Sequence, residues 1–474
     1  MLFNSPEFLV LLGTALALYW SVGDQRVRFG TLLVASLVFY AFWYPPYLII
    51  LFVLCAAAYP AALYIERADD RRANLATAGF VSFIIAVLAY FKYTGYFASL
   101  AEPVFRRLGI QIQPDAMAIA LPLGISFFTF QLIAYVVDVR MKRAPAERNP
   151  LMVLLFICFF PHLIAGPICR PNQLIPQLAA RARFDARGFF CGGAVLAAGL
   201  FLKAGFADNL APFVGGVFRT AGEATGGQAV SATISFGIQI LADFWGYSTM
   251  ALGMAMMFGV YLPINFNLPY LATSLRDFWR RWHMTLSFWL RDYLYIPLGG
   301  SREGRFRTNL NLFITMALGG LWHGAANTFI IWGLIHGAYL VFERGVTWAL
   351  GKVLPASGLP PVVQGWFARP AGWLATMGVV FVAWVFFRAS SVSEAFQILD
   401  AASTPLTGWD QVPRRTIALI LAFAVLMVPV HRLITAGLNR QLAIPWALAA
   451  TFWLCVLAVV LQAPEPIPFI YFQF

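Results

Sequence analysis

The sequence is poor in charge, which a water-exposed surface needs. Only 11% of its 474 residues are Asp, Glu, Lys or Arg, whereas 60% are hydrophobic, and the mean hydropathy is +0.73. Soluble domains carry about 25% charged residues, so this chain has too little polar surface to stay in solution. The scarcity excludes an ordinary soluble protein and indicates an integral membrane protein.

Motifs for metal chemistry and for serine hydrolysis are also missing. The five cysteines are scattered without CxxC spacing, which favours small buried apolar residues over metal ligands. The sequence has no HExxH pattern and no GxSxG elbow, which disfavours a zinc hydrolase and a serine hydrolase. We expect no bound metal, although His283 and His323 could converge in space.

Apolar runs of membrane-spanning length are what the sequence has in abundance. They recur along the whole chain, for example at residues 8–22, 29–44, 47–65 and 76–96, and a helix of about 20 residues crosses a bilayer core of about 30 Å. The pattern predicts an all-α, polytopic membrane protein with about 11 to 13 transmembrane or re-entrant helices. With no repeat and no long polar stretch, we expect one membrane domain over 1–474, with N-terminal helices in 1–110, a catalytic core in 111–345 and C-terminal helices in 346–474.

The formal net charge of +12 has two readings. Nucleic acid binding is one, but polytopic proteins collect Lys and Arg in cytoplasmic loops for topological reasons, and basic clusters such as 67–72 and 140–143 fall between apolar runs. We therefore expect no nucleic acid partner. With Arg26, Arg28 and the cluster at 67–72 in the cytoplasm and the turn at 44–47 opposite, we expect the N-terminus to lie outside.

Residues 274–300, SLRDFWRRWHMTLSFWLRDYLYIPLGG, are dense in Arg and Trp and have helical periodicity. A helix here ends at the Pro297–Gly300 turn, and a hydrophilic loop, 301–308, follows. One face collects polar residues spaced by three or four, and another collects aromatic ones; the polar face contains Arg276, Arg280, His283, Ser287 and Arg291. An interfacial helix anchored at lipid headgroups explains this pattern, and so does a helix whose arginines meet an anionic ligand.

The chain has only five histidines, and a titratable group within apolar segments usually has a function. His323 follows GGLW and precedes Gly324, so the backbone can pack closely around a ligand there, and a neutral imidazole can act as a general base. His162 lies between helix-breaking prolines and is expected to be structural. His336 is expected to pack in the core and to make hydrogen bonds there, and His431 is expected to lie at the membrane interface.

The chain resembles the membrane-bound O-acyltransferases, in particular the bacterial alginate O-acetyltransferase-like branch. The resemblance runs from near Leu2 to Phe474 and is most specific from Phe278 to Gly300 and at the following LWHG. The segments that carry it are 122–139, 159–178, 243–300, 311–337 and the terminal FIYFQF at 469–474.

The resemblance implies helices around a central funnel and tunnel, with acetyl-CoA as a cytoplasmic acyl donor. The family's catalytic histidine matches His323, and its second motif histidine matches His283, which either catalyses or positions. Within the matched motifs we also expect residues that bind the substrate or the cofactor. They are Arg276, Arg280, Arg281, Arg291, Asp243, Asn267 and Trp322. The arginines hold coenzyme A phosphates or the lipid headgroups near them.

The resemblance also implies a bacterial inner-membrane protein that passes acetyl across the membrane. A periplasmic or membrane-anchored partner with a nucleophilic serine, of the SGNH type, then acetylates an exported polysaccharide, alginate or an alginate-like polymer. Cellulose and peptidoglycan remain open as acceptors. Where members of the family commonly have DFSGYSD, this chain has DFWGYST. Trp245 and Thr249 thus replace a serine and an acid, and they leave the identity of the acceptor or of the relay partner undecided. A transporter or lipid flippase and a scaffold for a secretion complex are alternatives of other classes.

Overall fold

The chain is helical throughout the part that the structure describes. The computed structural model describes residues 1–111, 113, 119–164, 166–353, 361–462 and 469–470, and no strand occurs among them. The all-α prediction is confirmed. Residues 471–474 of the terminal FIYFQF lie outside the described residues.

Nineteen α-helices occur in these ranges. They are α1 (Pro6–Ser21), α2 (Gln25–Ala41), α3 (Tyr47–Arg67), α4 (Asp70–Arg107), α5 (Ile125–Arg140), α6 (Pro150–Cys158), α7 (Phe160–Leu163), α8 (Pro171–Ala179), α9 (Ala186–Phe201), α10 (Asp208–Arg219), α11 (Gly226–Met257), α12 (Leu275–Trp279), α13 (Met284–Leu290), α14 (Gly304–His323), α15 (Asn327–Val353), α16 (Pro361–Arg388), α17 (Val392–Ala402), α18 (Arg414–Leu438) and α19 (Ile444–Val460). Short 3-10 and π segments link or extend them: η2 (Leu202–Ala207), η3 (Ala221–Glu223), η4 (Pro269–Leu271), η5 (Arg291–Tyr295) and η6 (Trp409–Gln411).

Several of these helices are long and apolar enough to cross a membrane. Within the described residues there are six such candidates, at Tyr47–Arg67, Asp70–Arg107, Ala186–Arg219, Asn327–Ala349, Arg369–Arg388 and Arg414–Leu438. The helices Pro6–Ser21 and Ile444–Val460 are apolar but shorter. Many outward-facing side chains are apolar, such as Val10, Leu421 and Val460, which is the surface expected of helices that contact lipid.

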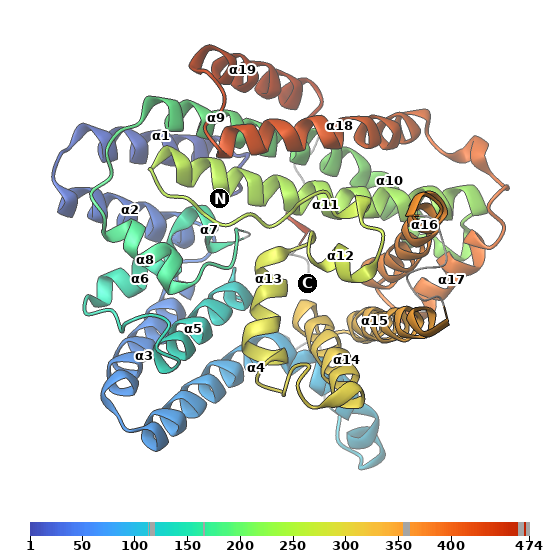
Figure 1. Ribbon diagram of the computed structural model, residues 1–474, viewed down its shortest axis with the longest axis horizontal. Helices are drawn as coiled ribbons and strands as arrows, with labels where there is room; N and C mark the ends of the chain where they lie inside the picture. Colours follow the sequence, from blue (N-terminus) through green and yellow to red (C-terminus); the bar gives the residue numbers. More distant parts are fainter. Residues whose placement is uncertain (112, 114–118, 165, 354–360, 463–468, 471–474) are drawn as a thin grey trace.

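The central helix is α11, which is buried along nearly its whole length. It crosses α9 at glycines: a Cβ at Gly199 would lie 2.5 Å from the Gly246 carbonyl oxygen, and one at Gly192 would lie 2.8 Å from that of Gly253. Small residues let helix backbones approach closely in membranes. Figure 1 shows α11 lying between α9 and the short α12 and α13, and α13 lying between α5 and α14 near the centre.

The prediction of one continuous helix from 274 to 296 is wrong. The chain forms α12, breaks over residues 280–283, and resumes as α13 and the π-helical η5. Periodicity alone could not show the break, because Arg280 to His283 contain no proline or glycine. The helix does end before Pro297 as predicted, whereas α14 begins at Gly304, so residues 304–308 of the predicted loop 301–308 are helical.

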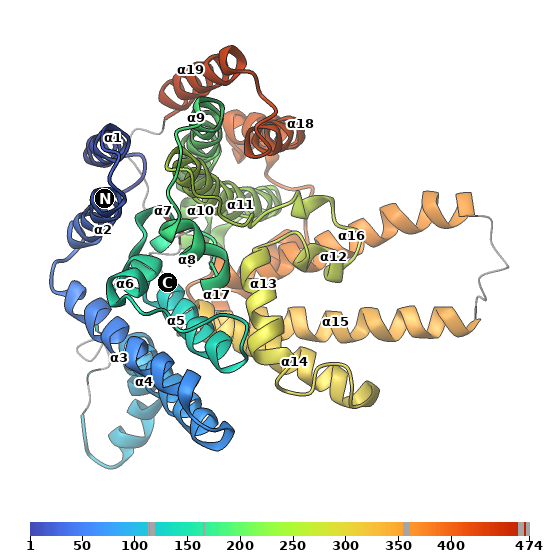
Figure 2. The ribbon, with the colours of Figure 1, turned by 60° about the vertical axis from the view of Figure 1, so that its left-hand side comes forward.

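The helices α14 and α15 form a close hairpin that ends beside the centre of the molecule. A Cβ at Gly320 would lie 2.4 Å from the Phe329 carbonyl oxygen, and one at Gly333 would lie 2.5 Å from the Met316 carbonyl oxygen. From this hairpin, α15 runs outward beside α16, and Figure 2 shows the two extending together from the rest of the chain. The hairpin fixes where the last residue of α14, His323, lies.

Candidate active site

His283 lies in the break between α12 and α13, in a left-handed backbone conformation. Its φ is 40° and its ψ is 55°, values that few residues other than glycine adopt. The ring is fully buried and lies 4.6 Å from the Phe244 ring. Neither ring nitrogen has a hydrogen-bond partner in the described part of the chain. Backbone strain and buried polar groups without a partner are features that gather at functional sites.

The extended segment before α12 holds this strained turn in place. The Met284 N–H donates to the Asn265 carbonyl oxygen at 2.9 Å, and the Thr285 hydroxyl donates to Asn265 Oδ1 at 2.6 Å. Asn265 Nδ2 donates to Ser248 Oγ on α11 at 3.0 Å. Asn265 therefore ties the residues that follow His283 to the central helix.

His323 ends α14 with its ring packed among aromatic side chains. The residue is 3% exposed, and the rings of Trp322 and Trp332 both lie 4.9 Å from its own. Gly324 follows it in an extended conformation, where a Cβ would lie 2.1 Å from the Phe329 ring. The glycine does allow close packing, as the sequence suggests, but against the protein's own Phe329.

Trp322 brings the two matched histidines to one place. Its ring lies 6.4 Å from the His283 ring and 4.9 Å from the His323 ring, and it stacks on Phe130 of α5 at 5.0 Å. His323 ends α14 and His283 lies in the break between α12 and α13, and the fold places both against one indole.

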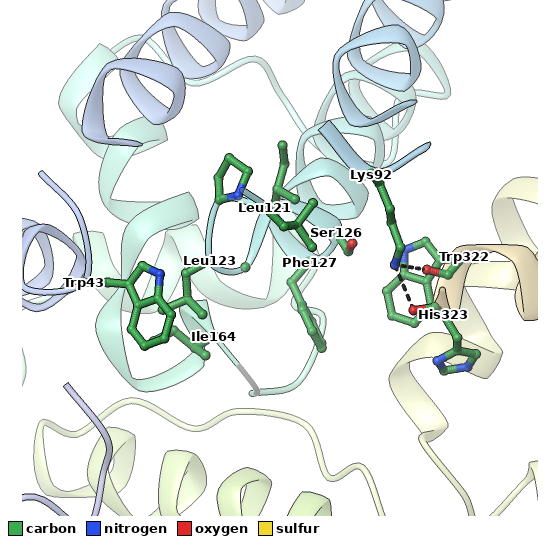
Figure 3. Close-up of a pocket in the computed structure, with 12 residues that line it drawn as sticks. Trp43, Lys92, Leu121, Leu123, Ser126, Phe127, Ile164, Trp322 and His323 are labelled. Carbon is green, nitrogen blue, oxygen red and sulfur yellow. Dashed lines mark hydrogen bonds between the residues drawn. The ribbon is translucent and has the colours of Figure 1, made fainter. Parts of the chain in front are cut away.

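A small pocket opens beside His323 (Figure 3). Its volume is about 70 Å³. Lys92 reaches into it from α4, and its ammonium donates to the carbonyl oxygens of Trp322 and His323. The pocket is lined by Trp43, Lys92, residues 121–127, Ile164, Trp322 and His323.

The close contact of α14 and α15 gives a test of how this site is built. Gly333→Ala is expected to destabilise the protein by about 1 to 3 kcal/mol, because its methyl group has no room against Met316. Gly345→Ala on the same helix is the matched control, since nothing lies within 4 Å of its Cβ position. Thermal unfolding of both variants in detergent measures the difference. Equal melting temperatures would show that the hairpin can separate without cost.

The remaining histidines have different surroundings. His162 Nδ1 is 3.0 Å from Gln131 Nε2, and its Nε2 is 3.1 Å from the Phe156 carbonyl oxygen, so its structural role is confirmed. His336 packs against Trp332, with ring centres 4.7 Å apart. Its ring nitrogens have no hydrogen-bond partner among the described residues, so the prediction of core hydrogen bonds is wrong.

His431 lies near the two positions that depart from the family pattern. Its ring is 6.0 Å from that of Trp245, and with Thr249 and Asn265 both residues line a small cavity of about 20 Å³. Asn265 also holds the turn at His283, so the cavity that Trp245 and Thr249 line shares a residue with the support of the second histidine.

A larger and basic cavity is lined by residues of α12, α13, η5, α14 and α15. Its volume is about 360 Å³, and Arg276, Ser287, Arg291 and Arg344 are among its lining residues. Arg276 and Arg344 also line an adjoining hollow together with Arg305. The polar face predicted from periodicity thus partly survives the break in the helix, because α12 and η5 both turn toward this cavity.

The two other predicted arginines are not brought to the cavity. Arg281 pairs with Asp277 at 2.9 Å, and Arg280 is exposed and is not among the cavity lining. At the cavity, Arg291 pairs with Asp292, which also pairs with Arg170. Burial raises the pKa of Asp292, but the hydrogen bonds from the two arginines outweigh it and hold that pKa below its usual value.

Asp243 is buried in an ion-pair network. Its Oδ1 is 2.8 Å from Lys203 Nζ, which is 2.6 Å from Asp208 Oδ1, and its Oδ2 accepts the Ile470 N–H at 2.6 Å. Asp243 therefore fixes a C-terminal residue of the chain against α11. Asn267 is half-buried, and its N–H donates to the Arg281 carbonyl oxygen at 2.9 Å. A direct binding role for either residue stays a prediction.

Sequence reasoning missed Lys92, Asn265, Arg305 and Arg344. A lysine in a long apolar run is itself a signal of function, so Lys92 could have been found. The other three carry no such signal, because their importance comes from neighbours distant in sequence. No cluster of three metal-ligating side chains occurs within the described ranges, and the absence of a metal stays a prediction.

Known proteins with similar sequences define the class of this chain. The model of the MBOAT, membrane-bound O-acyltransferase, family matches residues 141–354. A probable alginate O-acetylase of Pseudomonas aeruginosa is 38% identical over 85% of this chain and 74% of its own length, and one of Pseudomonas putida is 36% identical over 100% of both. A peptidoglycan O-acetyltransferase of Helicobacter pylori is 35% identical over 78% of this chain and 72% of its own length.

The chain belongs to the membrane-bound O-acyltransferase family. It is a multi-pass membrane enzyme that transfers an acyl group from a donor to an oxygen. Membership of an enzyme family decides against the alternatives of a transporter, a flippase or a scaffold.

Proposed function

We propose that this enzyme takes acetyl from cytoplasmic acetyl-CoA and passes it across the bacterial inner membrane for O-acetylation of an exported polysaccharide. The observation that carries the proposal is that His323 lines the small pocket and is linked through two indole rings to the wall of the basic cavity. The small pocket reaches it directly. Trp332 contacts both His323 and Trp279, a wall residue of the basic cavity, with ring centres 4.9 and 5.8 Å apart.

The basic cavity suits coenzyme A. Arg276, Arg291 and Arg344 present guanidinium groups, which match phosphate oxygens in a forked geometry. The carboxylate of Glu343 also lines the cavity, but it accepts the Leu275 N–H at 2.7 Å and so is engaged with α12. The basic rim favours a cavity mouth on the cytoplasmic side by the positive-inside rule, which is the side where acetyl-CoA is found.

In this proposal His323 is the general base. An acceptor hydroxyl gives its proton to the imidazole while its oxygen bonds to the thioester carbonyl carbon. The carbon–sulfur bond then breaks, and the leaving thiolate takes the proton from the imidazolium. His283 lies against the same indole as His323 and positions the donor or the base, or takes part in the proton transfer.

The acceptor proposed for this step is a serine of a partner protein rather than the polymer. His323 is almost fully buried, and the pocket of about 70 Å³ is far below the ~300 to 1,000 Å³ of pockets for drug-sized ligands. A slender side chain fits such a pocket better than a sugar chain does. An acyl-serine on the partner would divide one hard transfer into two easier ones.

The final acceptor proposed is alginate or an alginate-like polysaccharide. The support is the full-length similarity to the probable alginate O-acetylase of Pseudomonas putida. Peptidoglycan is the second candidate, favoured by the relative from Helicobacter pylori, and cellulose is a third that the same chemistry would serve. O-acetyl analysis of each polymer from cells with and without the enzyme distinguishes them.

Donor recognition gives a direct test. Arg344→Gln and Arg276→Gln are each expected to raise the KM for acetyl-CoA about 10-fold or more, since a hydrogen bond to a charged group contributes about 1.5 to 3 kcal/mol. Initial rates of CoA release measure this, in membranes from cells that express the enzyme together with its natural export machinery. Arg280→Gln is the matched comparison, because Arg280 lies outside the cavity lining. An equal rise for Arg280→Gln, or no rise for the other two, would contradict donor binding in this cavity.

A further inference from the structure

We infer that Lys92 is a positioning residue for His323, acting through the backbone at the end of α14. The inference rests on the proposed role of His323 as the base. Lys92 Nζ donates to the His323 carbonyl oxygen at 2.9 Å and also to that of Trp322. The next residue, Tyr93, donates its hydroxyl to the Leu321 carbonyl oxygen at 2.6 Å.

Two adjacent residues of α4 thus satisfy three consecutive carbonyls in the last turn of α14. The last four carbonyls of any helix lack partners within the helix, and at membrane depth no bulk water replaces those partners. Many helices solve this with a left-handed glycine that folds back on the last turn. Gly324 instead leaves in an extended conformation, with φ −163° and ψ 156°, so the partners come from α4.

An ammonium suits this position for two physical reasons. It has three donors and so can reach two carbonyls at once. Its charge is attracted to the partial negative charge at a helix C-terminus. The Lys92 ammonium also lies 5.8 Å from the centre of the Trp322 ring, the ring that contacts both histidines. A substitution at Lys92 is therefore expected to disturb Trp322, whose ring contacts both His323 and His283.

The position of the base matters more than its presence nearby. Displacing a catalytic group by about 1 Å can cost on the order of 10²-fold in rate. The rings of Trp332 and Phe387 pack against the His323 ring. His323 is also the last residue of α14, so its backbone lies where the chain leaves the helix. Lys92 and Tyr93 hold this end of α14, and Figure 3 shows the lysine reaching both carbonyls from the pocket side.

The test is a series of substitutions at Lys92 scored by kcat and KM separately. Lys92→Met is expected to lower kcat on the order of 10- to 100-fold, with the KM for acetyl-CoA changed less than twofold. Lys92→Arg is expected to restore most of the rate, since a guanidinium can also bond two carbonyls. Initial rates of CoA release are measured in membranes from cells that express the enzyme with its natural export machinery.

Two further comparisons separate positioning from general stability. Tyr93→Phe is expected to lower kcat about 3- to 10-fold, a loss of about one hydrogen bond, whereas Tyr90→Phe, on the same helix with an exposed side chain, leaves it unchanged. In a His323→Ala background, Lys92→Met is expected to lower the residual rate no further, because residues that act as a unit are not additive.

Three results would overturn the inference: no loss in Lys92→Met, an arginine no better than methionine, or an equal loss with and without His323. If Lys92→Met does not fold, Tyr93→Phe and the arginine variant still decide. If acetyl-CoA is not the acyl donor, the wild-type enzyme releases no CoA from it, and this result is distinct from any effect of the Lys92 substitutions. The Lys92 series is then scored with whichever acyl donor the wild type uses.

Discussion

Replacing His323 by alanine is expected to lower acyl transfer by about 10² to 10⁴, the usual contribution of a general base. The residue is buried and lines the small pocket, and its ring contacts Trp322, through which it is linked to His283. Removing the ring takes away the proton acceptor while leaving α14 and its contacts with α15 in place. O-acetyl content of the exported polymer and CoA release both measure the loss.

A matched pair of substitutions separates chemistry from packing. His323→Phe and His336→Phe each replace a buried imidazole with a phenyl ring. Both imidazoles lie with their ring centres within 5 Å of that of Trp332. Only the first is expected to abolish transfer, because His336 lies outside the lining of the small pocket. Wild-type acetylation in His323→Ala, or equal loss in both phenylalanine variants, would remove His323 from the role of base.

In reconstituted vesicles, acetylated polysaccharide is expected only when a serine-bearing partner is added. The purified enzyme is placed in vesicles with acetyl-CoA on the side of the basic cavity and oligosaccharide on the other. The narrow pocket at His323 and the two-step chemistry of an acyl-serine both favour a relay. With the partner, we expect CoA release and acetylated sugar together; without it, both should fall to background.

The control for this experiment is a partner whose nucleophilic serine is replaced by alanine. It should bind the enzyme but support neither CoA release nor sugar acetylation. Acetylated sugar formed by the enzyme alone would refute the relay and would mean that the pocket opens enough to admit a sugar hydroxyl.

The helical class and much of the site could be predicted from the sequence, and particular residues show why. Apolar runs such as 47–65 lie within α3 because length and hydropathy suffice to specify a spanning helix. His323 stood out because an imidazole in an apolar stretch beside glycines is rare. By contrast, periodicity predicted one helix through residues 274–296, and the chain breaks at His283, where Asn265 supplies the competing hydrogen bonds.

The sequence by itself determined that this chain is all-helical and spans a membrane. Those properties depend on local composition, since a bilayer requires every spanning segment to satisfy its own backbone groups. Only the tertiary structure decided which polar groups meet. It joined Lys92 and Tyr93 to the end of α14, placed Arg344 with Arg276 in one cavity, and left Arg280 outside it. These contacts link residues far apart in the chain, and no local pattern encodes them, because they depend on how whole helices pack.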